Sequence, residues 1–377
     1  MELTQDILSY IHLHAQQAQE LLIELAQIPA PSHFEHERAE FCANWLKNQG
    51  AEGVYIDEAL NVIYPIGCNG NNPIAVFMAH SDVVFPDTTP LPLRISDGRI
   101  YCPGVGDDTA NVVALLMTAK YIAQHKLSPK ETGVLLVVNS GEEGLGNLKG
   151  SRKILEDFGT RITEFITFDG AVREIVNRAV GSCRYKIEVN TEGGHSYSKF
   201  GNRNAIAELS SIVHALYSVT VPEIGKTTYN VGTISGGTSV NTIAQHAEML
   251  YEYRSDEREA MEIMEQRLQD ILNHYRNLGV DISVSLLGSR PCSGDLDWNR
   301  EEILMNRAAS AVQEHYGYEV SFRSGSTDCN IPLSLGIPAV CVGCAEGEGA
   351  HTREEWVDIQ SLRPGLGVAF QLILHHF

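Results

Sequence analysis

Short, continuous apolar runs alternate with stretches of helical periodicity along the first part of the chain. Residues 74–79 and 134–138 contain only apolar side chains, and residues 110–125 between them have the apolar spacing of a helix. Continuous apolar strands are typical of parallel strands covered on both faces, because a solvent-exposed face would require alternating polar residues. The pattern therefore predicts an α/β fold whose mainly parallel sheet carries helices on both faces.

The pattern changes near residue 180 and returns after Pro291. In the intervening part, strands of alternating polarity and two helices predict an α+β sandwich with one exposed sheet face. These elements are expected at residues 182–192, 204–216, 227–234, 247–254, 256–278 and 281–287. We therefore predict an inserted lid or dimerisation domain, residues 179–290, between two parts of a catalytic domain, residues 1–178 and 291–377.

Charge and composition exclude several partners. The 48 acidic and 28 basic residues give a net charge of −20, which opposes binding to nucleic acid or to an anionic membrane and suits metal ions. Residues 1–6 have no signal-peptide pattern, and the longest apolar runs have strand length, whereas a membrane span needs about 20 residues. The eight scattered cysteines do not form a disulfide framework. We expect a cytoplasmic protein.

Five segments place histidines or carboxylates at or just after predicted strand ends, where ligands bind in open α/β sheets. They are His80-Ser81-Asp82, Asp107-Asp108, Glu142-Glu143, Asp169-Gly170 and His351. Taken singly, each has an alternative interpretation: a core histidine, a helix cap or a solvated turn. Together they suit a hydrolytic site for zinc or a related divalent pair, since burying so many like charges without a cation is very costly.

The order of these motifs resembles the co-catalytic metallopeptidase family that includes peptidase T, carnosinase-type dipeptidases, aminoacylase and succinyl-diaminopimelate desuccinylase. The resemblance extends over nearly the whole chain and implies a zinc-exopeptidase-like fold. Further matching pieces are Ile28-Pro-Ala-Pro-Ser32, the Gly-Gly-His-Ser at 193–196, residues 202–206, the Gly-Gly-Thr-Ser-Val-Asn at 236–241, and Ser326-Thr-Asp328.

The resemblance implies two divalent metal ions, zinc in our prediction, with manganese and cobalt as alternatives. The family pattern assigns one ion to His80 and Asp169, the other to Glu143 and His351, and a bridging role to Asp107.

Three further features follow from the same resemblance. The Asp82 carboxylate is expected to orient the His80 imidazole as a metal ligand without binding the metal itself. Glu142 is expected to act as general base on a metal-bridging water, and then as general acid toward the leaving amine. The peptide bond between Asp107 and Asp108 is expected to be cis.

Residues of the inserted domain complete the predicted site. The resemblance implies that His195 stabilises the oxyanion in the active site of a partner subunit, which predicts a homodimer. Asn241 and Arg254 resemble lid residues that hold a substrate carboxylate. From the residues alone, His195 is equally interpretable as a loop residue, and Arg254 as a salt-bridge residue at a strand end.

The substrate class is predicted from Asp169. In this family Asp at that place accompanies aminopeptidases and dipeptidases, whereas Glu accompanies deacylases and carboxypeptidases. We therefore predict an exopeptidase acting on short peptides, as an aminopeptidase or a di- or tripeptidase. The alternative is an N-acyl-amino-acid deacylase or carboxypeptidase with the same dimetal site. The family's usual lysine and glycine after Asp108 are replaced by Thr109-Ala110-Asn111, which leaves the contacts to substrate near this turn open.

Two hypotheses of other classes are weaker. Gly144-Leu-Gly146 and Gly150 have GxGxxxG spacing, which differs from the GxGxxG of dinucleotide-binding oxidoreductases. A metal-binding scaffold without turnover would not need a base such as Glu142 beside its ligands.

Overall fold

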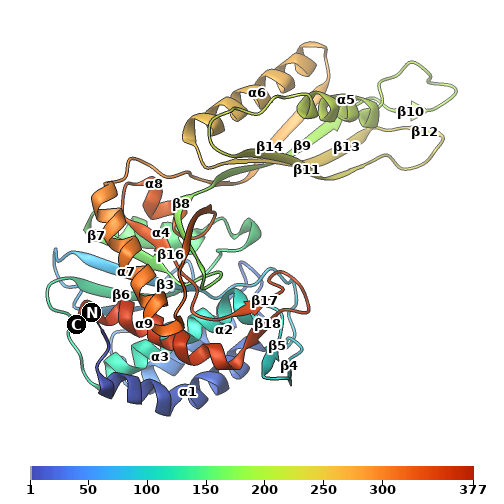
Figure 1. Cartoon of the computed structure of the whole chain (residues 1–377). Helices are drawn as coiled ribbons and strands as arrows, with labels where there is room; N and C mark the ends of the chain where they lie inside the picture. Colours follow the sequence, from blue (N-terminus) through green and yellow to red (C-terminus); the bar gives the residue numbers. More distant parts are fainter. Residues whose placement is uncertain (1) are drawn as a thin grey trace. The chain divides into compact units, whose positions relative to one another are not determined.

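A central eight-stranded sheet organises the first of two units in this computed structural model, which describes residues 2–377. The chain up to Ala179 together with Gly294–Phe377 forms unit 1, and Val180–Ser293 forms unit 2. Figure 1 traces both units along the chain.

The sheet of unit 1 has the strand order β1-β2-β6-β3-β7-β16-β8-β15. β3 pairs in parallel with β6 and β7, β16 with β7, and β15 with β8, whereas β1 with β2, β2 with β6, and β16 with β8 are antiparallel. The predicted mainly parallel sheet is confirmed. Its strands are β1 (Tyr55–Ile56), β2 (Val62–Ile66), β3 (Ile74–His80), β6 (Gly133–Asn139), β7 (Ile162–Thr167), β8 (Glu174–Ala179), β15 (Ser321–Gly325) and β16 (Ala339–Cys341).

Helices cover both faces of this sheet. Successive side chains of a strand point to opposite sides, so a strand that is apolar throughout has two apolar faces to bury. Along β3, Ala75, Phe77 and Ala79 join one hydrophobic cluster, and the residues between them join another. The first cluster is completed by α1 (Gln5–Ala26), α2 (His36–Asn48), α3 (Ala110–Gln124), α7 (Trp298–Tyr316) and α9 (Leu362–Leu374), and the second by α4 (Lys149–Phe158) and α8 (Asn330–Ser334).

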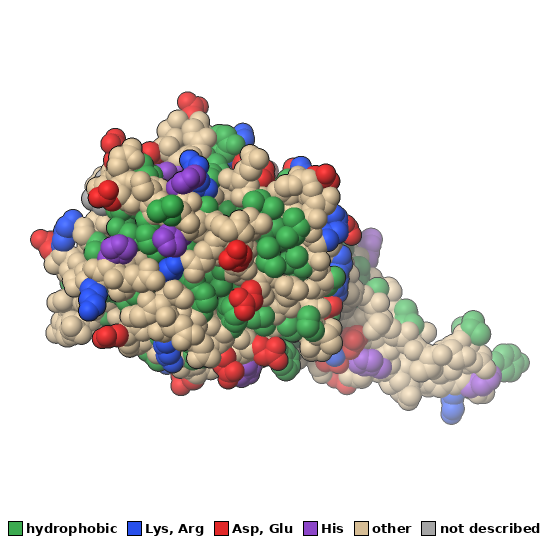
Figure 2. All heavy atoms as spheres, turned by 90° about the horizontal axis from the view of Figure 1, so that it is seen from below, with side chains coloured by type: hydrophobic (Ala, Val, Ile, Leu, Met, Phe, Trp, Pro, Cys, Tyr) green, Lys and Arg blue, Asp and Glu red, His purple; other side chains and the backbone are tan. Residues whose placement is uncertain are grey.

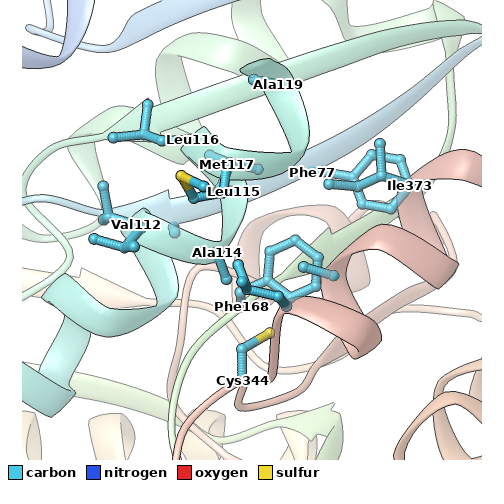
Figure 3. Close-up of a cluster of buried hydrophobic side chains, with 14 of the residues drawn as sticks. Phe77, Val112, Ala114, Leu115, Leu116, Met117, Ala119, Phe168, Cys344 and Ile373 are labelled. Atoms are coloured by element: carbon cyan, nitrogen blue, oxygen red, sulfur yellow. The ribbon is translucent and has the colours of Figure 1, made fainter. Parts of the chain in front are cut away.

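The core beneath α3 and α9 is shown in Figure 3. Phe77 of β3 stacks against Phe168, which follows β7, with ring centroids 6.2 Å apart. Side chains of α3 and Ile373 of α9 surround this pair. This packing fixes the ends of β3 and β7, from which two of the predicted site segments emerge.

Shorter elements lie between these strands and helices. A second small sheet in unit 1 has the order β17-β18-β5-β4. Its strands are β4 (Arg94–Ser96), β5 (Arg99–Tyr101), β17 (Gly347–Glu348) and β18 (Trp356–Asp358). The single helical turns are η1 (Val105–Thr109), η2 (Gly144–Gly146), η3 (Gly159–Arg161) and η4 (Ile359–Ser361).

Unit 2 is an antiparallel sheet, β11-β13-β9-β14, with two helices packed on one face. On β9, Tyr185, Ile187 and Val189 point into the hydrophobic cluster beneath the helices, and the residues between them are polar. The elements are β9 (Gly181–Asn190), α5 (Ala205–Tyr217), β11 (Thr227–Gly236), β13 (His246–Ser255), α6 (Arg258–Asn277), β14 (Asp281–Arg290) and a small ribbon of β10 (Gly194–His195) and β12 (Thr242–Ile243).

Charged side chains are dispersed on the molecular face seen in Figure 2. Acidic, basic and histidine side chains alternate there with hydrophobic ones, without a broad basic patch. Among residues 2–377, no helix combines the length and apolarity that crossing a membrane requires.

Candidate metal centre

Predicted site residues lie at or just after the carboxyl ends of three neighbouring strands, at one edge of the central sheet. His80 is the last residue of β3, Glu142 and Glu143 follow β6, and Asp169 follows β7. Because β6, β3 and β7 are adjacent and parallel, their carboxyl ends lie side by side. The remaining predicted ligands come from η1, which holds Asp107, and from the loop between β17 and β18, which holds His351.

Asp107 faces both predicted histidines. Its Oδ1 lies 3.1 Å from Nε2 of His80, and its Oδ2 lies 3.1 Å from Nε2 of His351. Nε2 of His351 is also 3.1 Å from Oε1 of Glu143. One carboxylate therefore joins two histidines, as a bridge between two ions requires.

Two groups of potential ligand atoms overlap at His80. His80, Asp107 and Glu143 have ligand atoms within 4.8 Å of one another, and so do His80, Asp108 and Asp169. All five predicted metal-ligating residues thus come together in unit 1. Asp108 is not among the predicted ligands. Its Oδ2 accepts a hydrogen bond from the His80 backbone N–H (2.8 Å), and its Oδ1 accepts one from Asn111 (2.5 Å).

Burial and charge perturb the titration of this cluster. Burial, followed by the charge of Asp107, raises the pKa of Asp169 to about 7. Hydrogen bonds to Asp107 and Glu143 raise the pKa of His351 to about 10. Burial favours neutral His80, but the charge of Asp108 and the hydrogen bond to Asp107 outweigh it and raise the His80 pKa. A group of carboxylates this dense holds positive charge, as protons or as a cation.

The donor set fits divalent metal ions. Imidazole nitrogen and carboxylate oxygen are ligands of zinc at about 2.0–2.2 Å, so two ligands of one tetrahedral ion lie about 3.3–3.6 Å apart. The nitrogen–oxygen distances at Asp107 are only slightly shorter. The side chain of His80 is 1% exposed and that of His351 is 57% exposed, so the cluster is accessible from the His351 side.

Asp82 connects three parts of the cluster. Its carboxylate accepts hydrogen bonds from the backbone N–H groups of Glu142 (3.0 Å) and Glu143 (2.9 Å) and from the Ser32 hydroxyl (2.7 Å). Nδ1 of His80 lies 3.0 Å from the Asp82 carbonyl oxygen and 3.5 Å from its carboxylate. Asp82 therefore orients the imidazole mainly through its backbone, and its carboxylate fixes the Glu142-Glu143 turn.

Two features of the adjoining turns bear on the predicted chemistry. Glu142 is nearly buried at 6% exposure, next to Glu143 in the same turn. The peptide bond between Asp107 and Asp108 is cis, which confirms that prediction.

The other predicted residues lie in unit 2. His195 of β10 pairs with Thr242 of β12, and Asn241 precedes that strand. The Asn241 carbonyl accepts the N–H of Ser196 (2.9 Å), so His195 and Asn241 occupy the same ribbon. Arg254 lies on β13, where Nε and Nη2 each make a 3.0 Å hydrogen bond to the carboxylate of Glu252.

A further group of possible ligands, Glu188, His246 and Glu248, lies on the sheet of unit 2. Lys186 is 3.0 Å from Glu188 and 2.8 Å from Glu248. A protein cation therefore already contacts both of these carboxylates.

Besides Asp108, two buried carboxylates beside the cluster have no role in the sequence-based prediction. Glu355, 2% exposed, accepts hydrogen bonds from the loop that carries Asp107. Asp328, 1% exposed, accepts a 2.5 Å hydrogen bond from Asn139 at the end of β6. Asp328 belongs to the Ser326-Thr-Asp328 motif, from which no individual role is predicted. Glu355 carries no local signal, because its partners are backbone groups about 250 residues away.

A cavity of about 410 Å³ adjoins Asp107. Its walls come from the segment after Asp169, the segment before His351, and β18. A substrate group bound in this cavity would lie next to the metal-binding cluster.

The chain is similar to known hydrolases along most of its length. Residues 76–375 match the family described as Peptidase family M20/M25/M40. An acetylornithine deacetylase from Myxococcus xanthus is 28% identical over 341 residues, which cover 86% of each chain. A succinyl-diaminopimelate desuccinylase from Methylobacillus flagellatus is 25% identical over 325 residues, which cover 80% of this chain and 83% of that one.

The fold is shared with solved structures. A tripeptidase from Staphylococcus aureus subsp. aureus Mu50 superimposes with a TM-score of 0.76 at 22% identity, covering 95% of this chain and 97% of that one. With the family match over residues 76–375 and the metal-binding groups of unit 1, the chain is a metal-dependent hydrolase of peptidase family M20/M25/M40.

Proposed function

We propose that this protein is an exopeptidase that hydrolyses an amide bond in short peptides with two divalent ions held by unit 1. His80 and Asp169 would hold one ion, Glu143 and His351 the other, and Asp107 would bridge them. We propose zinc, because the ligands are imidazoles and carboxylates, with manganese and cobalt as alternatives.

The geometry of Asp107 carries this proposal. Each of its carboxylate oxygens lies 3.1 Å from a different histidine. His80 lies 27 residues before Asp107 in the chain, and His351 lies 244 residues after it. A carboxylate that served only as a salt-bridge partner would not need to face two imidazoles from such distant segments.

The catalytic steps follow from the side chains around this centre. A bound divalent pair would lower the pKa of water and polarise the scissile carbonyl. Glu142 would accept the proton of the attacking water and donate it to the leaving amine. Asp82 would hold Glu142 in place through the 3.0 Å hydrogen bond to its backbone N–H. The near-burial of Glu142 keeps bulk water away from this proton transfer.

We propose that residues 179–290 form a lid and dimerisation domain within a homodimer. Exposed apolar side chains near the β10–β12 ribbon support a contact surface: Tyr197 is 89%, Phe200 91% and Val240 102% exposed. Within the described chain, β11 pairs on one side only, with β13. An open strand edge of this kind can accept a strand of a second copy.

His195 would then serve as the oxyanion donor of the partner subunit's site, and Asn241 would bind the substrate carboxylate. Arg254 is a weaker candidate for that role, because its guanidinium is already paired with Glu252. The eight cysteines, all free thiols, support a reducing compartment and therefore a cytoplasmic location.

The second candidate is an N-acyl-amino-acid deacylase or carboxypeptidase with the same centre. The acetylornithine deacetylase and the succinyl-diaminopimelate desuccinylase favour it, because these relatives match most of the chain. Asp169 favours the peptidase, by the family pattern given above.

A substrate panel separates the two candidates. Purified protein reconstituted with zinc, manganese or cobalt would be assayed with free dipeptides and tripeptides and with N-acetyl and N-succinyl amino acids, with Glu142→Ala as the control for contaminating activity. We expect the free peptides to give the higher kcat/KM. Rapid deacylation without peptide hydrolysis would establish the second candidate, and no hydrolysis of either class would refute both.

A further inference from the structure

Glu355 is a buried carboxylate next to the metal-binding cluster but outside every predicted site role. It lies four residues after His351 and directly before β18, and it is 2% exposed. A buried carboxylate requires compensating donors or charge. Its partners therefore indicate what it does.

Both oxygens of Glu355 are occupied by backbone N–H groups of the Asp107 loop. Oε2 accepts from Gly104 at 2.7 Å, and Oε1 accepts from Gly106 and from Asp107 itself, both at 2.8 Å. Successive N–H groups that converge in this way form an anion-binding concavity, here filled by a side chain of the same protein.

Gly106 makes this close approach sterically possible. A Cβ at this position would lie 3.1 Å from Oε1 of Glu355 and 3.3 Å from a methyl group of Val357. A larger residue would therefore push the loop away from the carboxylate.

The backbone joins the same two segments. The N–H of Cys102 donates to the Glu355 carbonyl (3.2 Å), and Trp356 of β18 pairs with Tyr101 of β5. Figure 1 shows β18 next to β5. The loop after β5 carries Asp107, and the loop before β18 carries His351. Glu355 thus lies where these two loops meet.

Two other roles fit Glu355 less well. Glu355 is among the residues that line the adjoining cavity, but both of its carboxylate oxygens already accept hydrogen bonds from backbone donors. It also belongs to none of the groups of potential metal ligands among residues 2–377.

We propose that Glu355 is a positioning residue that locks the Asp107 loop to the His351 loop and so sets the spacing of the two ions. The inference rests on the proposed function, in which Asp107 and His351 hold metal. In this role Glu355 acts through the backbone N–H of Asp107.

The test compares Glu355→Gln with the matched control Glu354→Gln. Glutamine keeps the size of the side chain but replaces one acceptor oxygen with an NH2 group, which opposes a backbone donor. Glu354 is the adjacent residue, with its side chain 82% exposed. Three properties would be measured in the full-length protein: zinc affinity by competition with a chromophoric chelator, kcat and KM, and amide hydrogen exchange at residues 104–107.

For Glu355→Gln we expect zinc affinity to fall about ten- to hundredfold, as for other residues that orient metal ligands. We expect kcat to fall with little change in KM, and the amides of Gly104, Gly106 and Asp107 to exchange faster. Glu354→Gln should match the wild type in all three. Gly106→Ala should shift zinc affinity and exchange in the same direction by a smaller factor, and it provides the test if Glu355→Gln does not fold.

The positioning role would be refuted if Glu355→Gln had the same zinc affinity and the same amide exchange as the wild type. It would also be refuted if the variant lost zinc only to the extent that the whole protein unfolds, as measured by circular dichroism. If the wild type itself binds no divalent ion, the proposed function fails. The exchange of the three amides then still decides whether Glu355 locks the loop.

Discussion

Glu301, a buried acid in the first turn of α7, is expected to make the stability of unit 1 depend on pH. Its side chain is fully buried, and Oε2 accepts a 3.0 Å hydrogen bond from the N–H of Ala339 at the start of β16. Oε1 has no hydrogen-bond partner among residues 2–377. Burial, opposed only in part by the Ala339 N–H, raises the pKa of Glu301 from 4.5 to about 7.

The raised pKa means that the fold favours the protonated form of Glu301, which sets the direction in which stability changes with pH. A carboxyl group whose pKa is higher in the native state stabilises the fold below its unfolded pKa, and this stability is lost as pH rises through the native pKa. One pKa unit corresponds to about 1.4 kcal/mol, so the rise from 4.5 to about 7 amounts to about 3 kcal/mol. About 2.5 kcal/mol of this is lost between pH 5 and pH 8.

Glu301→Gln isolates this effect. Glutamine still accepts the Ala339 N–H but does not titrate, and its unpaired NH2 group costs about 1–3 kcal/mol at every pH. We therefore expect the free energy of unfolding of the variant minus that of the wild type to increase by about 2.5 kcal/mol from pH 5 to pH 8, so that the variant becomes more stable relative to the wild type.

Equilibrium urea unfolding at both pH values, followed by tryptophan fluorescence with the same divalent ion present, measures this difference. The control is Glu302→Gln, an exposed neighbour on the same helix. A difference between Glu301→Gln and wild type that stays constant within about 0.5 kcal/mol, well below the shift derived by linkage, would refute the reasoning.

Three substitutions at the metal centre are expected to separate binding from turnover. Asp82→Asn should weaken zinc binding about 10–100-fold, because an amide cannot accept from both N–H groups of the Glu142-Glu143 turn; chelator competition measures this, and unchanged affinity would contradict the role of Asp82. Glu142→Ala should keep both ions by elemental analysis while kcat falls by at least about 100-fold; substantial residual activity would exclude Glu142 as the general base. His351→Ala should lose one of the two ions, whereas a variant that still binds two would show that His351 is not a ligand.

Strong local patterns predicted much of the fold. Residues 74–79 and 134–138 became the buried strands β3 and β6, because only a strand covered on both faces is apolar throughout. The helix expected at 110–125 is α3, Ala110–Gln124.

Elements defined by tertiary contacts were not predicted. α9 contains Gly365 and Gly367, each of which lowers helix propensity by about 1 kcal/mol. Both glycines are explained only by packing, since a side chain at Gly365 would collide with the carbonyl of Cys344 and one at Gly367 with the His315 ring. β8 and β15 mix polar and apolar residues and pair in parallel with each other, so no periodicity marks them.

The candidate site shows the same division. The five proposed ligands could be named because the family resemblance points to all of them, and three of them, His80, Glu143 and Asp169, also lie at or just after strand ends. Asp108 and Glu355 were missed because their partners are backbone N–H groups and side chains brought near by folding.

The strand order of unit 1 also constrains when the protein becomes functional during its synthesis. β16, Ala339–Cys341, fills an interior position between β7 and β8, although it is made after the whole of unit 2. A nascent chain that has emerged only as far as Ser293 therefore has a gap in its sheet and lacks His351. If His351 holds metal as proposed, hydrolysis therefore requires a chain that has been synthesised past residue 351, well beyond the whole of unit 2.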